Sequence, residues 1–212
     1  MTTHVFFIHG LFMTGAEATP LRRELARELG ARTHVFAYLA TAERPEAVAA
    51  RLARRIAAVP ARDTVHLVGH SFGGLIALRA AAAANRAPGG RIVLLGTPTA
   101  GSGAAAALAR LPVLHFALGR SGAALTSPVA RREVPCEIGV IAGSRAAGLG
   151  RFFAHFREPN DGTVAVRETE LPGATDRIVL PVSHTGMLLS RRVARETAQF
   201  LRYGRFSLDA SS

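Results

Sequence analysis

Short runs of apolar residues alternate along the chain with longer segments in which apolar residues recur every three or four positions. The short runs are rich in Val, Ile, Leu and Phe with little polar alternation, which is typical of parallel strands covered on both faces. They predict six strands, at Val5–Ile8, His34–Tyr38, Thr64–Val68, Arg91–Leu95, Glu137–Ile141 and Arg177–Leu180. The longer segments predict helices, at Glu17–Leu29, Pro45–Ala58, Phe72–Ala84, within Gly103–Leu118 and near Met187–Tyr203.

Strands that alternate with helices predict an α/β fold, with a doubly wound, mainly parallel sheet of about six strands and right-handed crossovers. A chain of 212 residues suits one domain with a full-sized core. The connection from Leu95 to Glu137 is longer than one crossover helix needs. We interpret residues 99–133 as a small cap or pocket segment, with an irregular crossover as the alternative.

The hexapeptide Gly-His-Ser-Phe-Gly-Gly at residues 69–74 lies between a predicted strand and a predicted helix. Glycines two positions before and after Ser71 permit a turn so tight that larger side chains would clash. Such a turn lifts the serine hydroxyl to the top of a sheet and aims the positive end of the next helix at it. This context predicts a nucleophile elbow, with a glycine-rich turn without chemistry as the alternative.

A serine hydroxyl is a weak nucleophile until a base, usually histidine, takes its proton, and a carboxylate usually orients that base. The histidines after Ser71 are His115, His155 and His184. His184 directly follows the last predicted strand, at the kind of strand end where catalytic groups gather. We therefore expect His184 to be the base, whereas the apolar surroundings of His115 and His155 suit packing or a pocket wall.

Only four aspartates compete for the role of the acid. Asp63 precedes the elbow, Asp209 lies in the tail, and Asp176 opens the last strand at the wrong end. Asp161 follows the fifth predicted strand in an Asn-Asp-Gly turn and is the expected acid, with Glu158 of the same loop as the alternative. Because Asn-Asp-Gly also favours turns, a purely structural role for Asp161 stays open.

An oxyanion hole requires two preorganised N–H donors. We expect one to be the backbone N–H of Phe72, directly after the serine. The second should come from the loop after the first strand, where Gly10 permits a turn, and we expect Leu11, with Phe12 as the fallback. His9 and His70 are expected to be structural.

Apolar side chains near these donors are candidates for binding substrate. Leu11, Phe12, Met13 and Phe72 are expected to line an apolar entrance. Leu114 and Phe153 lie in two further apolar stretches, which either wall an acyl pocket or pack in the core.

Composition and charge limit the classes of binding partner that we expect and say little about the fold. The chain carries a net charge of +11, and its 26 basic residues are all arginine. The arginines are scattered, and two Tyr with no Trp offer little for base stacking, so nucleic-acid binding is not expected. Weak association with an anionic membrane surface is the alternative to a solvated basic surface.

Cysteine use and leader patterns bear on location and cofactors. The single cysteine, Cys136, allows no disulfide within the chain, and we see neither a signal peptide nor an apolar stretch long enough to span a membrane. A cytoplasmic location is therefore expected.

No ligand-spaced His, Cys and carboxylate cluster and no phosphate-binding loop occurs in the sequence, so we expect no metal and no cofactor.

Taken in order, these motifs resemble those of the α/β-hydrolase superfamily on its lipase and esterase side. The matching pieces are His9-Gly10, the elbow at 69–73, Leu95-Gly96-Thr97-Pro98, the turn at 160–164, and His184. Residues 96–98 are similar to a segment of bacterial triacylglycerol lipases and GPI inositol-deacylase-like proteins. The chain also resembles the minimal lipases, and this resemblance implies an α/β-hydrolase fold without a large cap domain. It also implies the strand order second, first, third, fourth, fifth, sixth.

The motifs and the resemblance predict a serine hydrolase that cleaves small-molecule or lipid esters. Ser71 would attack the acyl carbon, His184 would carry the proton, and Asp161 would orient His184. A thioesterase, an amidase or an acyltransferase could use the same residues. A non-catalytic binding protein on the same scaffold is the alternative from a different class.

Overall fold

Six parallel strands form one sheet in the computed structural model, which describes residues 1–84, 89–101, 134, 136–146 and 158–207. The strands are β1 (Thr3–Ile8), β2 (Arg32–Phe36), β3 (Thr64–His70), β4 (Ile92–Leu95), β5 (Ile138–Gly143) and β6 (Asp176–Leu180). Their order across the sheet is β2-β1-β3-β4-β5-β6, with parallel pairing throughout. The strand order implied by the resemblance is therefore confirmed.

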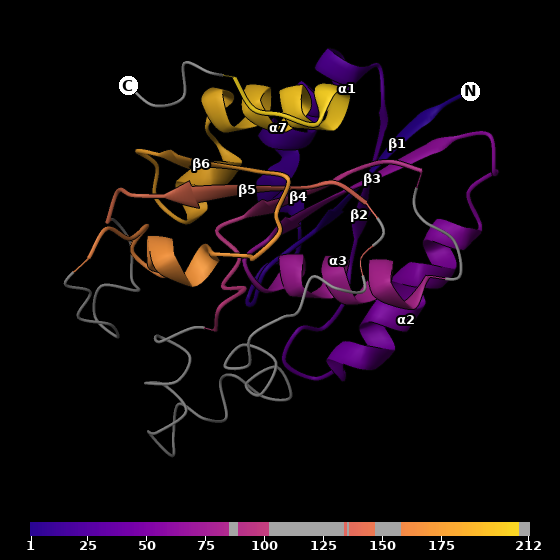
Figure 1. Cartoon of the computed structure of the whole chain (residues 1–212). Coiled ribbons are helices and arrows are strands. Elements are labelled where there is room, and N and C mark those ends of the chain that lie inside the picture. Colours follow the sequence, from indigo (N-terminus) through magenta and orange to yellow (C-terminus); the bar gives the residue numbers. More distant parts are fainter. Residues whose placement is uncertain (85–88, 102–133, 135, 147–157, 208–212) are drawn as a thin grey trace.

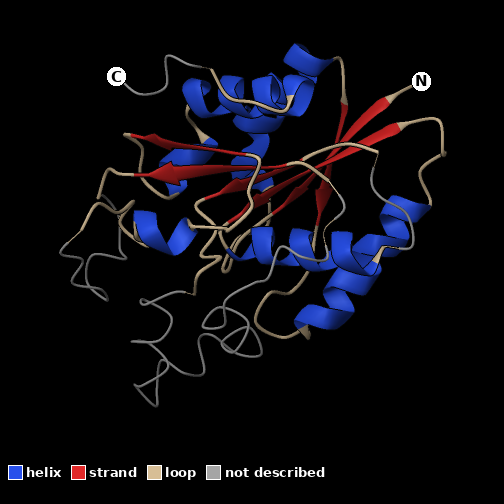
Figure 2. Ribbon diagram, viewed as in Figure 1, coloured by secondary structure: helices blue, strands red, loops and turns tan. Residues whose placement is uncertain are grey.

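Helices cover both faces of this sheet (Figure 1; Figure 2). The described α-helices are α1 (Thr19–Leu29), α2 (Pro45–Ala57), α3 (Phe72–Ala83) and α7 (Arg191–Tyr203). Short 3-10 turns are η1 (Ala16–Ala18), η5 (Val166–Thr169) and η6 (Thr185–Leu188). The helix expected within Gly103–Leu118, and nearly all of the segment 99–133, lie outside the described residues.

The core has two layers because successive side chains of a strand point to opposite faces of the sheet. On β1, Phe6 and Ile8 pack on the face covered by α2 and α3, whereas Val5 and Phe7 pack on the face covered by α1 and α7. Burial on both faces explains why the strand sequences lack polar alternation. The carboxyl ends of all six strands consequently meet at one edge of the sheet.

Two predicted boundaries are wrong for identifiable reasons. The second strand ends at Phe36 rather than Tyr38, because Tyr38 turns away to donate its hydroxyl to the carbonyl oxygen of His9. The last predicted helix is split into η6 and α7. Ser190 caps α7, since its hydroxyl accepts a hydrogen bond from Val193 N–H at 3.3 Å.

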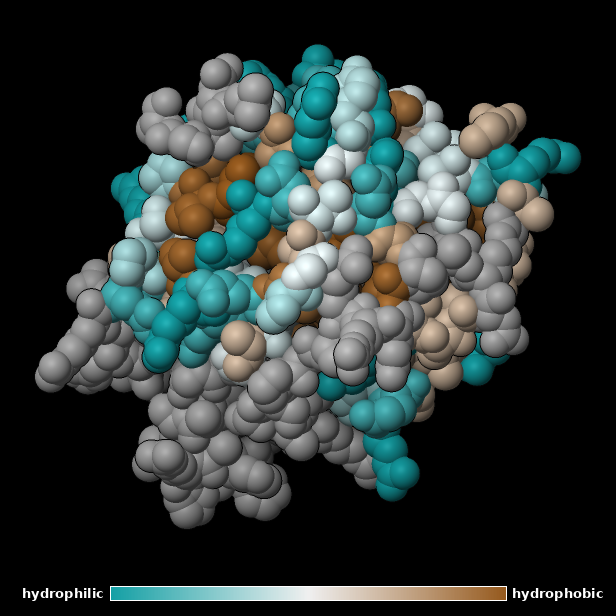
Figure 3. Space-filling view, in the orientation of Figure 1, coloured by the Kyte–Doolittle hydropathy of each residue, from teal (hydrophilic) through white to brown (hydrophobic). Residues whose placement is uncertain are grey.

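The surface shown in Figure 3 is mostly hydrophilic over α1 and α7, with apolar atoms gathered in small patches beside them. Large exposed apolar side chains of the described residues include Phe12, Leu39 and Leu189. Within the part of the chain that the structure describes, no helix combines the length and the apolar character needed to cross a membrane.

Candidate active site

The residues expected to form a nucleophile elbow adopt the tight strand–turn–helix geometry that such an elbow requires. Ser71 sits between the end of β3 and the start of α3, with φ 54° and ψ −127°, a conformation that non-glycine residues rarely adopt. Its N–H donates to Leu95 O at 2.8 Å, which ties the turn to the end of β4. A Cβ at position 73 would lie 2.2 Å from Ile8 O, so only glycine permits this close contact with β1. The turn is thus strained and fixed by its neighbours.

His184 and Asp161 form a buried pair at the same edge of the sheet. His184 follows β6, Asp161 follows β5, and His184 Nδ1 lies 2.7 Å from Asp161 Oδ2. The side chain of Asp161 is 1% exposed, and that of His184 is 12% exposed. The backbone N–H of His184 also donates to Asp161 O at 2.9 Å. Two hydrogen bonds therefore orient the imidazole against a carboxylate shielded from solvent.

The turn that carries Asp161 is closed by its own hydrogen bonds. Asp161 Oδ1 accepts from Thr163 N–H at 2.9 Å and from Val164 N–H at 2.7 Å. Asp161 therefore has both roles that the sequence left open. Its Oδ1 closes the turn, and its Oδ2 orients His184. Glu158, the alternative acid, instead pairs with Arg167 at 2.6 Å.

Gly96 brings the end of β4 against the histidine–aspartate pair. Its φ of 54° lies in the left-handed region that favours glycine. A Cβ at this position would lie 3.0 Å from Asp161 Oδ2 and 3.1 Å from His184 Nδ1. Since the preceding Leu95 holds the N–H of Ser71, the elbow and the pair meet across β4.

The loop after β1 is held in one orientation by buried polar side chains. His9 Nδ1 donates to Gly10 O at 2.9 Å, while His9 Nε2 accepts from Tyr38 N–H at 3.4 Å. The Tyr38 hydroxyl donates to His9 O at 2.6 Å, and the two rings stack with centroids 4.4 Å apart. Burial lowers the pKa of His9 and raises that of Tyr38, so both rings stay neutral in these roles.

This loop orients a free backbone donor. The peptide between Gly10 and Leu11 is trans, so its N–H points away from the carbonyl that His9 holds. Leu11 N–H donates to no other residue in the described ranges. Gly10 is adjacent to the elbow, since a Cβ there would lie 3.0 Å from Ser71 Cβ. Phe72 N–H, in the first turn of α3, is one of the donors that a helix leaves without an intrahelical partner.

The apolar side chains that we expected at an entrance differ in how far they are exposed to solvent. Phe12 is 73% exposed, with φ 57°, and Met13 is partly buried against the core layer under α1 and α7. Phe72 does not reach the surface as expected, because its side chain packs in the core layer under α2 and α3. Leu114 and Phe153 lie outside the described residues, as do His115 and His155.

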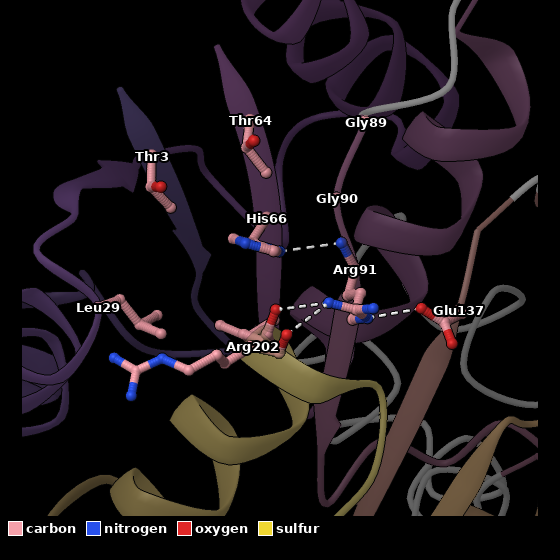
Figure 4. Close-up of a pocket in the computed structure, with 10 residues that line it drawn as sticks. Thr3, Leu29, Thr64, His66, Gly89, Gly90, Arg91, Glu137 and Arg202 are labelled. Carbon is pink, nitrogen blue, oxygen red and sulfur yellow. Dashed lines mark hydrogen bonds and ion pairs between the residues drawn. The ribbon is translucent and has the colours of Figure 1, made fainter. Parts of the chain in front are cut away.

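A separate pocket of about 390 Å³ lies at the opposite, amino edge of the sheet (Figure 4). Arg91 Nε pairs with Glu137 at 2.6 Å, and Arg91 Nη1 donates to the carbonyl oxygens of Leu201 and Arg202. His66 Nδ1 accepts from Arg91 N–H at 2.9 Å. These groups join β3, β4, β5 and the end of α7, so the interactions here are structural.

Two contacts at the carboxyl edge could not be read from the sequence. Tyr38 and His70 both contact residues of the site, and no spacing rule marks either one. The nearest signals were the His-Gly pair after the first strand and the histidine before the elbow serine, both of which we interpreted as structural.

Solved structures with a similar fold are hydrolases of several kinds. A lipase of Bacillus licheniformis in its propeptide form has a TM-score of 0.75 and 20% identity, covering 93% of this chain and 50% of that one. An esterase of Pyrococcus furiosus has a TM-score of 0.64 and 17% identity, covering 94% and 81%. The thioesterase RedJ of Streptomyces coelicolor has a TM-score of 0.61 and 14% identity, covering 95% and 84%.

These likenesses show the fold, which is the expected α/β-hydrolase fold, and the described residues include no large cap. The chain spans half the length of the Bacillus lipase. No curated protein sequence matches the chain. The model of the alpha/beta hydrolase family, however, matches residues 5–205, nearly the whole chain. The protein therefore belongs to the alpha/beta hydrolase family.

Proposed function

We propose that the protein is a serine hydrolase that cleaves carboxylic esters through Ser71, His184 and Asp161. The observation that carries the proposal is the buried His184–Asp161 pair, 2.7 Å apart, at the strand edge that also presents the strained Ser71. Strained backbone and a buried acid–base pair at one edge are typical of sites that perform nucleophilic catalysis.

The proposed mechanism assigns each proton to a stated atom. His184 Nε2 takes the proton of the Ser71 hydroxyl as the oxygen attacks the acyl carbon, and Asp161 stabilises the resulting imidazolium through Nδ1–H. The backbone N–H groups of Leu11 and Phe72 donate to the oxyanion. His184 then protonates the leaving alcohol. In the second step, a water attacks the acyl carbon as it gives a proton to His184 Nε2, and His184 returns that proton to the Ser71 oxygen as the acid leaves.

The proposal is less specific about the substrate than about the catalytic residues. Exposed Phe12 and half-buried Met13 stand beside the proposed oxyanion loop and would contact the acyl group, with Leu114 and Phe153 as further candidates. Small-molecule or lipid esters are the proposed substrates. A thioester is the second candidate, because the similar structures include a thioesterase. The cytoplasmic location and weak association with anionic membranes stay predictions.

Hydrolysis of p-nitrophenyl esters from acetyl to palmitoyl tests the proposal, with Ser71→Ala and His184→Ala alongside. We expect turnover by the wild type and a loss of at least about 10⁴-fold in each variant, at unchanged melting temperature. Acyl-thioester substrates at matched chain lengths would separate the two candidates. Full activity in a clean Ser71→Ala preparation, or a wild type inert to esters, thioesters and a fluorophosphonate probe, would contradict it.

A further inference from the structure

His70 joins the nucleophile strand to the proposed base. It is the last residue of β3, directly precedes Ser71, and is 0% exposed. Its Nε2 lies 2.9 Å from the backbone carbonyl oxygen of His184, and the two rings are 4.6 Å apart between centroids, tilted by 47°. The residue before the nucleophile thus contacts both the backbone and the ring of the base.

The hydrogen bond fixes the protonation of the His70 ring. Because a carbonyl oxygen only accepts, Nε2 of His70 carries the proton and donates it. Nδ1 is a buried atom that lacks a hydrogen-bond partner within the described part of the chain. Burial, followed by the proximity of His184, lowers the pKa of His70 to about 3. A neutral His70 therefore adds no second positive charge beside His184 when the latter takes up the serine proton.

Three hydrogen bonds determine where the His184 imidazole lies. Its N–H and its Nδ1 both bond to Asp161, and its carbonyl oxygen accepts from His70. The two bonds to Asp161 orient the ring relative to the acid but do not connect it to β3. Of the three, only the bond from His70 connects His184 to β3, the strand that leads to Ser71.

We propose that His70 is a positioning residue: by donating Nε2–H to the carbonyl oxygen of His184, it sets the distance between the His184 imidazole and the elbow that carries Ser71. The proposal rests on the function proposed above, because the distance matters only if Ser71 gives its proton to His184. Displacing a catalytic group by about 1 Å can lower the rate by roughly 100-fold. Loss of this donor should therefore lower kcat without weakening substrate binding.

Two substitutions separate the donor from the volume of the side chain. The amide nitrogen of His70→Gln is as many bonds from Cβ as the imidazole Nε2, whereas that of His70→Asn is one bond closer and cannot reach the carbonyl oxygen. On the best p-nitrophenyl ester, we expect Asn to lower kcat by about 30- to 100-fold with KM within about twofold. Gln should keep at least about a third of the wild-type kcat.

His66→Gln is the matched control. His66 lies on the same strand, is also buried, and hydrogen-bonds at the opposite edge of the sheet. We expect its melting temperature to fall as far as that of His70→Asn, with kcat within about twofold of the wild type. A folded His70→Asn variant with kcat within about threefold of the wild type would overturn the inference, as would a Gln variant no better than Asn.

An NMR measurement gives a readout that does not depend on turnover. The proton on His184 Nδ1, shared with Asp161, should shift in His70→Asn and stay near its wild-type position in His70→Gln and His66→Gln. An unchanged signal in His70→Asn would overturn the inference alone, while esters, thioesters and the fluorophosphonate probe still react with the wild type. A wild type inert to all three would overturn the proposed function, and the positioning role with it.

Discussion

The two ends of β3 each hold a buried histidine. Their surroundings differ in whether the nearby polar groups have hydrogen-bond partners. At the amino end, His66 accepts from Arg91 N–H, and the Arg91 guanidinium bonds to Glu137 and to the last carbonyls of α7. At the carboxyl end, Ser71 holds a strained conformation, and His70 Nδ1 and Leu11 N–H have no partner in the described residues.

The difference shows what distinguishes a candidate site from a structural one in this molecule. The hollow of about 390 Å³ lies at the amino end, where the polar groups named above are bonded to other parts of the protein. At the carboxyl end, the donor Leu11 N–H and the acceptor His70 Nδ1, both unpartnered within the described residues, and a strained turn are maintained, which costs stability and is found mainly where chemistry uses such groups. Among the residues that the structure describes, strained backbone beside unpartnered polar groups therefore makes the carboxyl end the candidate site, whereas a hollow alone does not make the amino end one.

Removing one carboxylate at each end should produce the largest contrast. Asp161→Asn presents an amide to His184 and favours the wrong imidazole tautomer, so we expect kcat to fall by about 10⁴-fold. Glu137→Gln loses only a half-exposed ion pair with Arg91 and should leave kcat within about twofold of the wild type. Steady-state kinetics on one ester measures both. Equal losses in the two variants would mean that the ends do not differ in this way.

Acidification should weaken the fold through its buried neutral histidines. Burial and the nearby Arg91 charge lower the pKa of His66 to about 4. The unfolded chain, with a histidine pKa of about 6.5, therefore binds more protons than the folded chain below neutral pH. The stability that His66 gives is complete above about pH 7 and is lost as the pH falls through 6.5 towards 4.

Urea unfolding at pH 7 and pH 5 measures this contribution. We expect the wild type to lose about 1–2 kcal/mol more of its free energy of unfolding over this range than His66→Gln does, since glutamine does not titrate. Parallel losses in the two proteins would show that the pKa of His66 does not fall on folding.

The smallest expected effect concerns the strain at Ser71. Glycine adopts φ 54° and ψ −127° readily, so Ser71→Gly should be more stable than the equally inactive Ser71→Ala by about 1 kcal/mol, or ~2–4 °C in melting temperature. Thr64 opens the regular strand at the other end of β3, so Thr64→Gly should instead be less stable than Thr64→Ala. The same sign at both positions would mean that the elbow is not strained.

The sequence carried enough information to predict the fold because burial on both faces leaves continuous apolar strands. The strand order followed from the resemblance, and the glycine pattern around Ser71 marked the elbow. Candidates for the base and the acid could be chosen because few His and Asp residues follow that serine, and parallel strands end at a common edge. Their roles, unlike their positions, stay predictions.

Other features depend on contacts that no local pattern encodes. The end of β2 was misplaced because the apolar run continues through Tyr38, whose hydroxyl bonds to a different strand end. His70 meets His184 across 114 positions of sequence. The position of the Phe72 side chain was not predictable either, because an apolar residue at the start of α3 suits both the core, where it packs, and an entrance.

The acid-bearing turn has a consequence for protein engineering. Besides the bonds made by Asp161, Asn160 Oδ1 accepts from Gly162 N–H, and Asn160 forms a bridge with Ala165, so the turn keeps its own shape. Glu158 and Pro159 belong to the same unit, since Asn160 Nδ2 donates to Glu158 O and Val166 N–H donates to Pro159 O. Randomised libraries that leave residues 158–166 intact should therefore keep Asp161 in register with His184.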